Sequence, residues 1–230
     1  PDTSASRWVI DFTGLSEDKA MSFGAPYRRV QATVLPERSA MTGQLHDKWW
    51  LYERPRMALR AAVDVMLEVL VIAVTSKTVM PLRVPRAHVF SNTVDVFALD
   101  GYGDQAVLSS SLHQLWAITY GSGMRNDPRY TPSDVFETFP RPVSTESLVG
   151  VGRSLDDRRR EIMLRRNLGL TKLYNLVNDP AMAGRSDADA MLIRDLHVEL
   201  DLAVLASYGW SDIDPLHGFY TFRNMERFTV

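Results

Sequence analysis

The sequence contains no cysteine among its 230 residues, which excludes disulfides and thiolate chemistry and fits a reducing cytoplasm. Long apolar runs are also missing. The longest, Val65–Val74, is interrupted by Glu68 and falls far short of the roughly 20 residues that span a bilayer. The chain begins at Pro1 with neither a Met nor a signal-peptide pattern. We therefore expect a piece of a longer cytoplasmic protein that does not enter a membrane.

Motifs for catalysis are absent as well. The five histidines show no pair at metal-ligand spacing, and the chain has no Gly-x-Ser-x-Gly elbow and no phosphate-binding Walker loop. Asp11, Glu17 and Lys19 loosely resemble the residue pattern of metal-dependent nuclease cores. Acidic residues at the start of a helix are, however, explained by their interaction with the helix dipole. Asn178–Gly184 echoes an S-adenosylmethionine loop, but Ala183 replaces the glycine that such a loop needs. The sequence predicts no catalytic residue, metal site or cofactor site of its own.

Charge is distributed unevenly along the chain. The net charge is −2, with 22 arginines and only 4 lysines. Residues 25–90 carry ten Arg or Lys against five Asp or Glu, whereas residues 143–230 carry eleven against thirteen. Arginine suits bidentate contacts with phosphates and guanines, although an arginine-rich genome gives the same bias. The local excess of +5 in residues 25–90 indicates where a polyanion would bind.

Hydrophobic periodicity predicts a mixed α+β fold. Residues 6–12 alternate weakly between apolar and polar side chains and predict a strand, and Ser16 is the expected N-cap of a helix. Helical pieces follow in residues 26–46 and again after Pro55. Two β-branched runs on either side of Ser76-Lys77 predict a hairpin or two neighbouring strands, and a third strand is expected at 93–99. Helices are expected at 104–120, 145–167, 170–178 and 187–207. The last of these has Ser186 as its N-cap with Asp189 as capping-box partner, and it ends at Gly209.

The segment Gly121–Pro142 combines glycines, prolines and arginines between a helix and a Pro-Arg-Pro boundary. It supplies no nucleophile–base pair, metal ligand set or cofactor cradle. We expect it to be a polar arm that Phe136 and Phe139 fix to the core, with Trp49 and Trp50 also in the core. The boundary predicts a mixed α/β domain with a small β-sheet at 1–142, of which about 1–50 is a connecting segment, followed by a helical domain at 143–230.

Six phrases of the sequence together carry a resemblance to a known family, and they cover almost the whole chain. They are RWVIDF, PERSAMTGQLHDKWWLYERPRMALRAAV, VFSNTVDVFAL, SSLHQLWAITYGSGMRNDPRYTPSDVFETFPRP, LTKLYNLVNDP and IRDLHVELDLAVLASYGW, in this order.

These phrases resemble the region after the catalytic domain in MmeI-like, YeeA-type DNA adenine methyltransferases of bacterial restriction–modification systems. The resemblance implies a target recognition domain followed by a helical C-terminal domain. It also implies that an upstream domain, absent here, binds S-adenosylmethionine and carries the Asn-Pro-Pro-Tyr tetrad. The expected partners are double-stranded DNA and that upstream domain, in a bacterial cytoplasm.

A methyltransferase of this kind flips its target base out of the duplex, so a separate surface must hold the distorted DNA in register. We expect phosphate contacts from Arg or Lys and base contacts from Arg, Asn or Gln. The candidate DNA-binding residues form two groups, one around the turn between the apolar strands and one in the arm: Ser76, Lys77, Thr78, Arg83, Arg86 and His88, and then Arg125, Asn126, Arg129 and Tyr130.

Other interpretations stay open at the level of sequence. Each candidate arginine would equally suit a solvated surface or an intramolecular salt bridge, and Arg158–Arg160 is typical of an exposed helix face with i,i+4 pairs. The chain as a whole would also suit a structural or protein-interaction module that docks on the methyltransferase domain without reading DNA. An autonomous nuclease is the weakest alternative.

Overall fold

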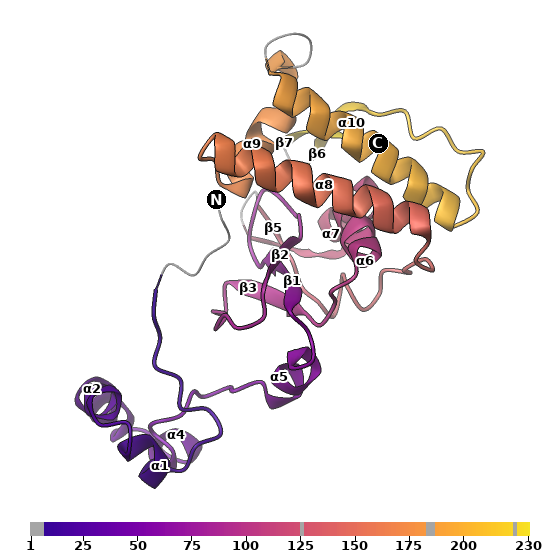
Figure 1. Cartoon of the computed structure of the whole chain (residues 1–230). Coiled ribbons are helices and arrows are strands. Elements are labelled where there is room, and N and C mark those ends of the chain that lie inside the picture. The colour runs from indigo at the N-terminus through magenta and orange to yellow at the C-terminus, as the bar shows by residue number, and fades with distance from the viewer. Residues whose placement is uncertain (1–6, 125–126, 183–186, 223–224) are drawn as a thin grey trace. The chain divides into compact units, whose positions relative to one another are not determined.

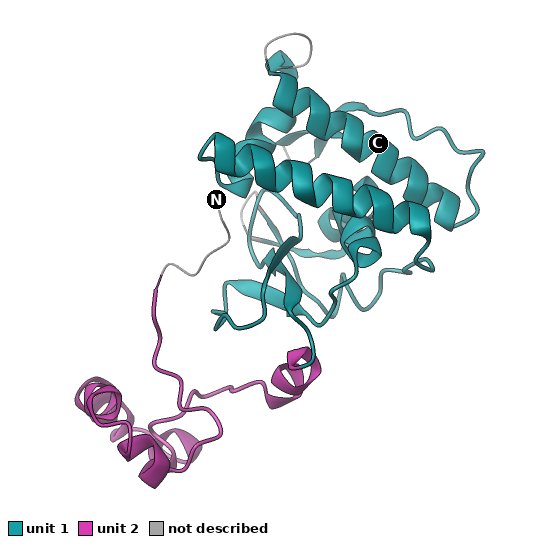
Figure 2. Cartoon of the chain, viewed as in Figure 1, with its two compact units in different colours: residues 1–4, 65–230 teal, residues 5–64 magenta. Residues whose placement is uncertain are grey.

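A computed structural model describes residues 7–124, 127–182, 187–222 and 225–230. The chain divides into two compact units, one formed by Ala5–Asp64 and the other by Val65–Val230 together with the first four residues (Figure 2). The fold is mixed α+β, as the sequence predicts. No helix among these described residues is long and apolar enough to cross a membrane.

The unit Ala5–Asp64 is a cluster of short helices around an aromatic core. Phe12, Ala20, Tyr27 and Trp49 are buried there, and Trp50 packs against them while its indole N–H donates to the Leu15 carbonyl at 3.0 Å. The Tyr27 hydroxyl donates to Glu17 at 2.8 Å. The helices are α1 (Glu17–Met21), α2 (Ala25–Thr33), α3 (Leu35–Arg38), α4 (Gln44–Asp47) and α5 (Met57–Val63).

The predicted strand at 6–12 is wrong for the residues that the structure describes, because Arg7–Phe12 has no regular secondary structure. A strand needs a neighbour to satisfy its backbone groups, and the described part of Ala5–Asp64 contains helices and loops only. The predicted cap at Ser16 is confirmed, since its hydroxyl accepts from the Lys19 amide at 3.3 Å.

The second unit contains a three-stranded antiparallel sheet of order β2-β1-β3, formed by β1 (Glu68–Ala73), β2 (Leu82–Pro85) and β3 (Val94–Phe97). The register pairs Val69 with Val84 and Leu70 with Phe97. Val69, Leu70 and Ile72 are fully buried, which explains why β1 reads as a continuous apolar run rather than an alternating one. The three strands predicted after residue 65 are therefore confirmed, unlike the one at 6–12.

Helices cover this sheet and form most of the unit (Figure 1). The predicted helical pattern at 104–120 divides at Ser110, whose side chain caps the second helix by accepting from the His113 amide at 3.2 Å. The helices are α6 (Tyr102–Ser109), α7 (Ser111–Tyr120), α8 (Glu146–Arg165), α9 (Leu170–Val177), the short 3-10 helix η1 (Pro180–Met182) and α10 (Ala188–Ser207).

Residues before and after the Pro-Arg-Pro segment at 140–142 belong to the same hydrophobic core. Ala106 and Val107 of α6 share this core with Leu148 and Leu155 of α8 and with residues of α9 and α10. At Gly152 the two helices approach so closely that an added Cβ would lie 2.1 Å from the Tyr102 carbonyl oxygen. The packing division of the chain thus falls at Asp64/Val65, and a functional division at 142/143 stays a prediction.

The part of the chain after residue 143 contains a hairpin that the sequence reading missed. Strands β6 (Gly218–Phe222) and β7 (Met225–Thr229) pair antiparallel, with Phe219 opposite Phe228. Phe219 and Phe228 lie 5.1 and 5.8 Å from the Arg194 guanidinium, which donates to the carbonyls that end α9. Arg194 therefore ties the hairpin, α9 and α10 together.

The ends of α10 are fixed by two different devices. Its N-cap is Asp187, which accepts from the Asp189 and Ala190 amides, whereas the predicted cap Ser186 lies outside the described residues. At the other end, Gly209 has a φ of +78°, and the Trp210 amide donates to the Leu205 carbonyl at 2.9 Å. This pattern is a Schellman motif, so the predicted stop at Gly209 is confirmed.

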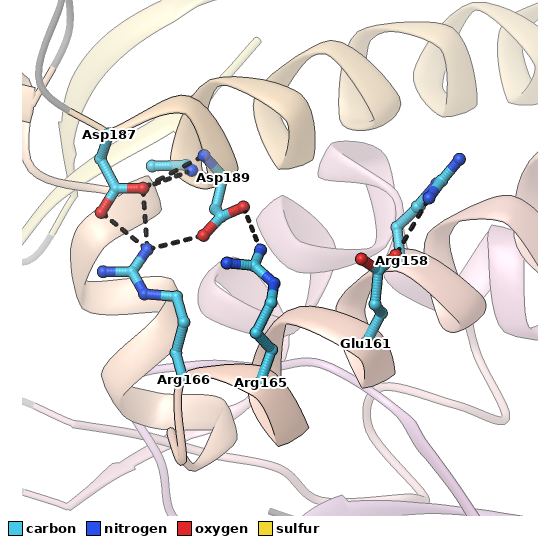
Figure 3. A network of polar contacts seen from close by, with 7 residues as sticks. Arg158, Glu161, Arg165, Arg166, Asp187 and Asp189 are labelled. Carbon is cyan, nitrogen blue, oxygen red and sulfur yellow. Dashed lines mark hydrogen bonds and ion pairs between the residues drawn. The ribbon is translucent and has the colours of Figure 1, made fainter.

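An ion-pair network holds the start of α10 to the end of α8 (Figure 3). Arg166 donates to both carboxylate oxygens of Asp187 at 2.8 Å, and Arg165 donates to Asp189 at 2.6 Å. Although burial raises the pKa of the Asp187 carboxyl, hydrogen bonds from Arg166 and from backbone amides lower it more, so the net pKa lies below its usual value. Arg158 pairs with Glu161 on the same helix at 2.9 Å, an i,i+3 pair where the sequence predicts i,i+4 pairs.

Candidate nucleic-acid interface

The turn residues of the first candidate group, Ser76 to Thr78, meet the second group along the backbone of the second unit. Arg86 instead lies at the other end of β1, where its amide donates to the Leu67 carbonyl at 3.1 Å. The turn after β1 runs beside β5 (Asp127–Arg129), so that Thr75 forms a bridge with Arg129. The Ser76 amide donates to the Pro128 carbonyl at 3.3 Å, and the Tyr130 amide donates to the Val74 carbonyl at 2.8 Å. Segments about 50 residues apart in sequence therefore form one continuous surface feature.

The arm itself begins as a hairpin in which β4 (Ser122–Met124) pairs with β5. Gly121 permits this arrangement, because an added Cβ there would lie 2.4 Å from the Ala117 carbonyl oxygen and 3.0 Å from that of Arg129. Two predicted DNA-binding residues of the hairpin, Arg125 and Asn126, lie outside the described residues. The rest of the arm is folded onto the unit, as expected. Phe139 is buried, and the ring centroids of Phe136 and Phe97 lie 4.7 Å apart.

Five candidate side chains are accessible to a partner. Lys77 and Arg129 are exposed on the two adjoining segments, and Arg86 is exposed just after β2. Ser76 and His88 are half-buried. The Ser76 hydroxyl oxygen accepts from the Thr78 amide at 3.0 Å, which fixes the tight turn that presents Lys77.

Three candidates are buried, and for these the prediction of a DNA contact needs correction. Thr78 is 4 % exposed, Arg83 is 4 % exposed and Tyr130 is 2 % exposed. Arg83 donates to the Asp100 carbonyl at 2.7 Å and to Gln105 at 3.3 Å. A side chain held in this way has no path to a phosphate, so we remove all three from the candidate set.

Arg83 belongs to a buried polar network that supports the sheet. Gln105, its partner, donates to Asp156 at 2.6 Å, and Asp156 accepts in turn from Arg159 at 3.4 Å. Arg159 also donates to the Pro81 carbonyl at 2.8 Å. Arg159 is 1 % exposed, so the middle arginine of the Arg158–Arg160 run is a core residue rather than part of a solvated face. Burying a charge is tolerated only when it is paired and hydrogen-bonded in this manner.

Tyr130 serves the core through a hydrogen bond with a buried histidine. Its hydroxyl lies 3.0 Å from Nε2 of His113, and Nδ1 of the same ring lies 2.8 Å from the Leu108 carbonyl oxygen. Since a carbonyl accepts only, Nδ1 carries the proton and Nε2 accepts from the tyrosine. Burial lowers the pKa of His113 to about 4 and raises that of Tyr130. Both groups are therefore uncharged at neutral pH.

One arginine that the sequence reading did not single out supports the candidate turn. Arg227 of β7 is 3 % exposed and donates to the Lys77 carbonyl from 150 residues away. Nothing local in the sequence signals this contact, because its cause is the hairpin at the end of the chain. Asn178, which begins the segment that resembles an S-adenosylmethionine loop, has a similar structural role. Its side-chain oxygen accepts from the Phe228 amide at 3.0 Å.

An open hollow of about 350 Å³ lies along the outer edge of β3. Asp95 and Phe97 line one side, and Pro132, Phe136 and Arg141 line the other. Burial raises the pKa of the Asp95 carboxyl, and the charge of Arg129 opposes that rise. The Arg141 guanidinium stacks 4.5 Å over the Phe136 ring. Arg129 thus adds positive charge near a half-buried carboxyl, and Arg141 adds positive charge to the lining of the hollow.

Asp11 and Glu17, two residues of the nuclease-like pattern, are bound to other side chains of the same unit. Asp11 is bonded to Arg60 at 2.8 Å, which with the hydrogen bonds of Thr13 outweighs burial and lowers the carboxyl pKa. Glu17 accepts from Tyr27. Among the described residues, no group of three or more His, Asp or Glu side chains is placed to hold a metal ion. What the accessible candidates offer is hydrogen-bond donors and positive charge.

Comparison with solved structures gives a neighbour for this mixed α+β fold. The chain is similar to the type IIL restriction–modification enzyme MmeI in a structure determined in complex with DNA, with a TM-score of 0.59 and 20 % sequence identity. The match covers 91 % of this chain and 26 % of that one, so the chain spans about a quarter of its neighbour's length. Neither the protein-family models nor the curated proteins give a match.

Proposed function

We propose that this chain is the DNA target-recognition portion of a restriction–modification protein. The observation that carries the proposal is the likeness of nearly the whole chain to part of an enzyme whose structure was solved with DNA bound. The described surface agrees with it, because exposed Lys77 and Arg129 lie on adjoining backbone segments. Cations held on a short turn and a paired strand are suited to phosphates along a duplex.

Within this proposal the residues divide by role. Lys77, Arg86 and Arg129 contact phosphates, which positions the module on the duplex. Ser76 adjoins Lys77 and His88 follows Arg86 closely in the chain, and both have groups that hydrogen-bond to sugar, phosphate or base edges. The buried residues Arg83 and Arg227 hold the strands and the turn in place.

The proposal extends to the parent protein. It is an S-adenosylmethionine-dependent DNA adenine-N6 methyltransferase of a bacterial cytoplasm, and its cofactor and chemistry reside in a domain outside this chain. The chain alone then neither binds S-adenosylmethionine nor methylates DNA. The test is incubation of the purified chain with duplex DNA and radiolabelled S-adenosylmethionine; transfer of label to the DNA would contradict the division of labour.

Binding of duplex DNA over a salt series tests the recognition role. Affinity measured by fluorescence anisotropy should fall steeply with salt, by a factor set by the number of phosphates contacted. The double substitution Lys77→Glu/Arg129→Glu should weaken binding about tenfold or more and reduce the salt slope by about 2, since each phosphate contact contributes about 0.9.

A matched control separates the proposed contacts from net charge. Arg158→Glu/Lys172→Glu changes the net charge by the same amount at exposed positions of α8 and α9. This variant should bind nearly as the wild type does. Equal weakening by both double variants would refute the placement of the interface, and salt-independent binding would refute the recognition role itself.

A further inference from the structure

The outward face of α10 is unusual for a surface helix. Its exposed residues recur at spacings of three and four, which places them in one stripe along the helix: Ala188, Leu192, Asp195, Glu199, Leu202 and Ala206. Leu192 is 38 % exposed and Leu202 is 47 % exposed, and Met191 beside the stripe is 42 % exposed. The outward face of a solvated helix is normally polar, so four apolar positions out of these six indicate a face that is covered by something else.

The apolar stripe continues beyond the end of the helix. Trp210, which closes the Schellman motif, is 45 % exposed and stacks on Tyr208 with ring centroids 4.8 Å apart. Ile213 is 48 % exposed and Leu216 is 68 % exposed in the segment that follows. Large apolar side chains therefore remain in water over the whole length of α10 and its extension.

All the exposed charges of this segment are negative. Between residues 187 and 216 the sequence has one arginine, Arg194, which is 6 % exposed and donates to four backbone carbonyls. His197 is 5 % exposed, and burial lowers its pKa to about 4. The exposed acidic side chains are those of Asp195, Glu199, Asp212 and Asp214.

We propose that this face, which we term the acidic stripe (Ala188 to Ala206 with Trp210 and Ile213), docks a helix whose own apolar stripe is flanked by arginines or lysines. The spacing of three and four is that of helices packed lengthwise. The stripe is about 28 Å long at 1.5 Å per residue, which accommodates a partner helix of about five turns. Leucines would meet leucines, and the partner's cations would meet Asp195 and Glu199.

The negative charge of this face disfavours DNA, an anionic membrane and a second copy of the chain as its partner. DNA and anionic membrane surfaces are repelled by four carboxylates, so the acidic stripe is separate from the proposed DNA interface at Lys77 and Arg129. A second copy of this chain in the same register would set acidic residues against acidic residues, which is unfavourable. The proposal does not depend on the DNA-recognition role, and the following test leaves that role unaffected.

Two synthetic helical peptides of 20 residues are the probes. Both carry leucines at the a and d positions of a heptad repeat, one with arginines and the other with glutamates at e and g. Fluorescence anisotropy with the whole chain should show at least tenfold tighter binding of the arginine peptide. Leu202→Asp should weaken that binding at least tenfold, and Asp195→Lys/Glu199→Lys should reverse the preference in favour of the glutamate peptide.

The matched control is Leu164→Asp, since Leu164 is a 49 % exposed leucine on α8, outside the acidic stripe. It should leave peptide binding unchanged, and thermal unfolding should show that all variants are folded. Equal binding of the two peptides, or equal loss in the Leu164 and Leu202 variants, would overturn the proposal. Sedimentation would overturn it as well if the wild type dimerised and Leu202→Asp did not, because the occupant would then be a second copy.

Discussion

At the scale of single residues, this protein uses arginine and histidine to complete its interior. Arg83, Arg159, Arg194 and Arg227 are all at most 6 % exposed, and each donates to at least one backbone carbonyl. A guanidinium with several donors in a plane is suited to ending helices and turns whose carbonyls have no other partner. The arginine-rich composition therefore reflects internal structure as well as any ligand.

His113 should make stability depend on pH. Its folded pKa of about 4 lies below the unfolded value near 6.5, so between these limits only the unfolded chain binds the proton. Stability is then complete above pH 6.5 and falls as the pH drops toward 4. His113→Gln keeps a donor for the Leu108 carbonyl and an acceptor for Tyr130 but does not titrate.

We expect the loss of unfolding free energy between pH 7 and pH 5 to be about 2 kcal/mol smaller in His113→Gln than in the wild type. Urea unfolding at the two pH values measures this difference. Identical losses in both proteins would show that the imidazole gains a proton in the folded state without penalty.

The residue scale is also where sequence reasoning failed most. Lys77 and Arg129 are exposed, as a contact with DNA requires, and their role in DNA binding stays a prediction. Arg83 looks the same in sequence, but it is buried because the register of β2 points it inward at Gln105 and Asp100. A side chain long enough to reach either water or a distant carbonyl is assigned by tertiary contacts, which a single sequence does not contain.

At the scale of elements, two glycines of α8 should respond in opposite ways to alanine. Gly150 is exposed, and an added Cβ would have no heavy atom within 4 Å. At Gly152 the added Cβ would lie 2.1 Å from the Tyr102 carbonyl oxygen and 3.1 Å from the Ala106 Cβ. The first position needs no glycine, whereas the second permits the contact of α8 with α6.

Gly150→Ala should therefore stabilise the protein by about 0.5–1 kcal/mol, because alanine is the better helix former. Gly152→Ala should destabilise it by about 2 kcal/mol or more, because the clash is with backbone and with a packed methyl. Denaturant unfolding of the two variants measures both signs. Equal effects would contradict the close packing of the two helices.

Asp187 both caps α10 and pairs with Arg166. Asp187→Ala removes both functions and should lower the unfolding free energy by about 2 kcal/mol, whereas Asp187→Asn keeps an oxygen for the cap and should cost about 1 kcal/mol. Arg158→Ala in the exposed pair with Glu161 is the control and should cost under about 0.5 kcal/mol. A cost for Arg158→Ala as large as that for Asp187→Ala would mean that the partly buried network adds nothing.

Elements were predictable where their signals are local. The apolar runs of β1 to β3, the cap at Ser16 and the stop at Gly209 follow from side-chain pattern and backbone preference. The hairpins β4–β5 and β6–β7 were missed because their strands have little apolar alternation and are stabilised by distant groups. Thr75 pairs with Arg129 in the first, and Asn178 binds Phe228 in the second.

At the scale of the whole molecule, positive charge divides unevenly between the two units. Ala5–Asp64 has nine Arg or Lys against seven Asp or Glu, and Val65–Val230 has seventeen against twenty. Seven of the ten basic residues in the segment 25–90 belong to the first unit. Of these seven, the exposed ones are Arg28, Arg29, Lys48, Arg54 and Arg56, and the unit also exposes Arg7 and Lys19. If the chain binds DNA, part of the electrostatic attraction should come from Ala5–Asp64.

A shortened chain of residues 65–230 tests this partition. It retains both large hydrophobic cores, so its thermal unfolding should resemble that of the corresponding unit in the whole chain. Its plot of log affinity for duplex DNA against log salt should be shallower by at least about 1, the value of one lost phosphate contact. Identical slopes would place all phosphate contacts in Val65–Val230, around Lys77 and Arg129. Complete loss of binding by a folded shortened chain would instead make the cations of Ala5–Asp64 the main source of DNA affinity.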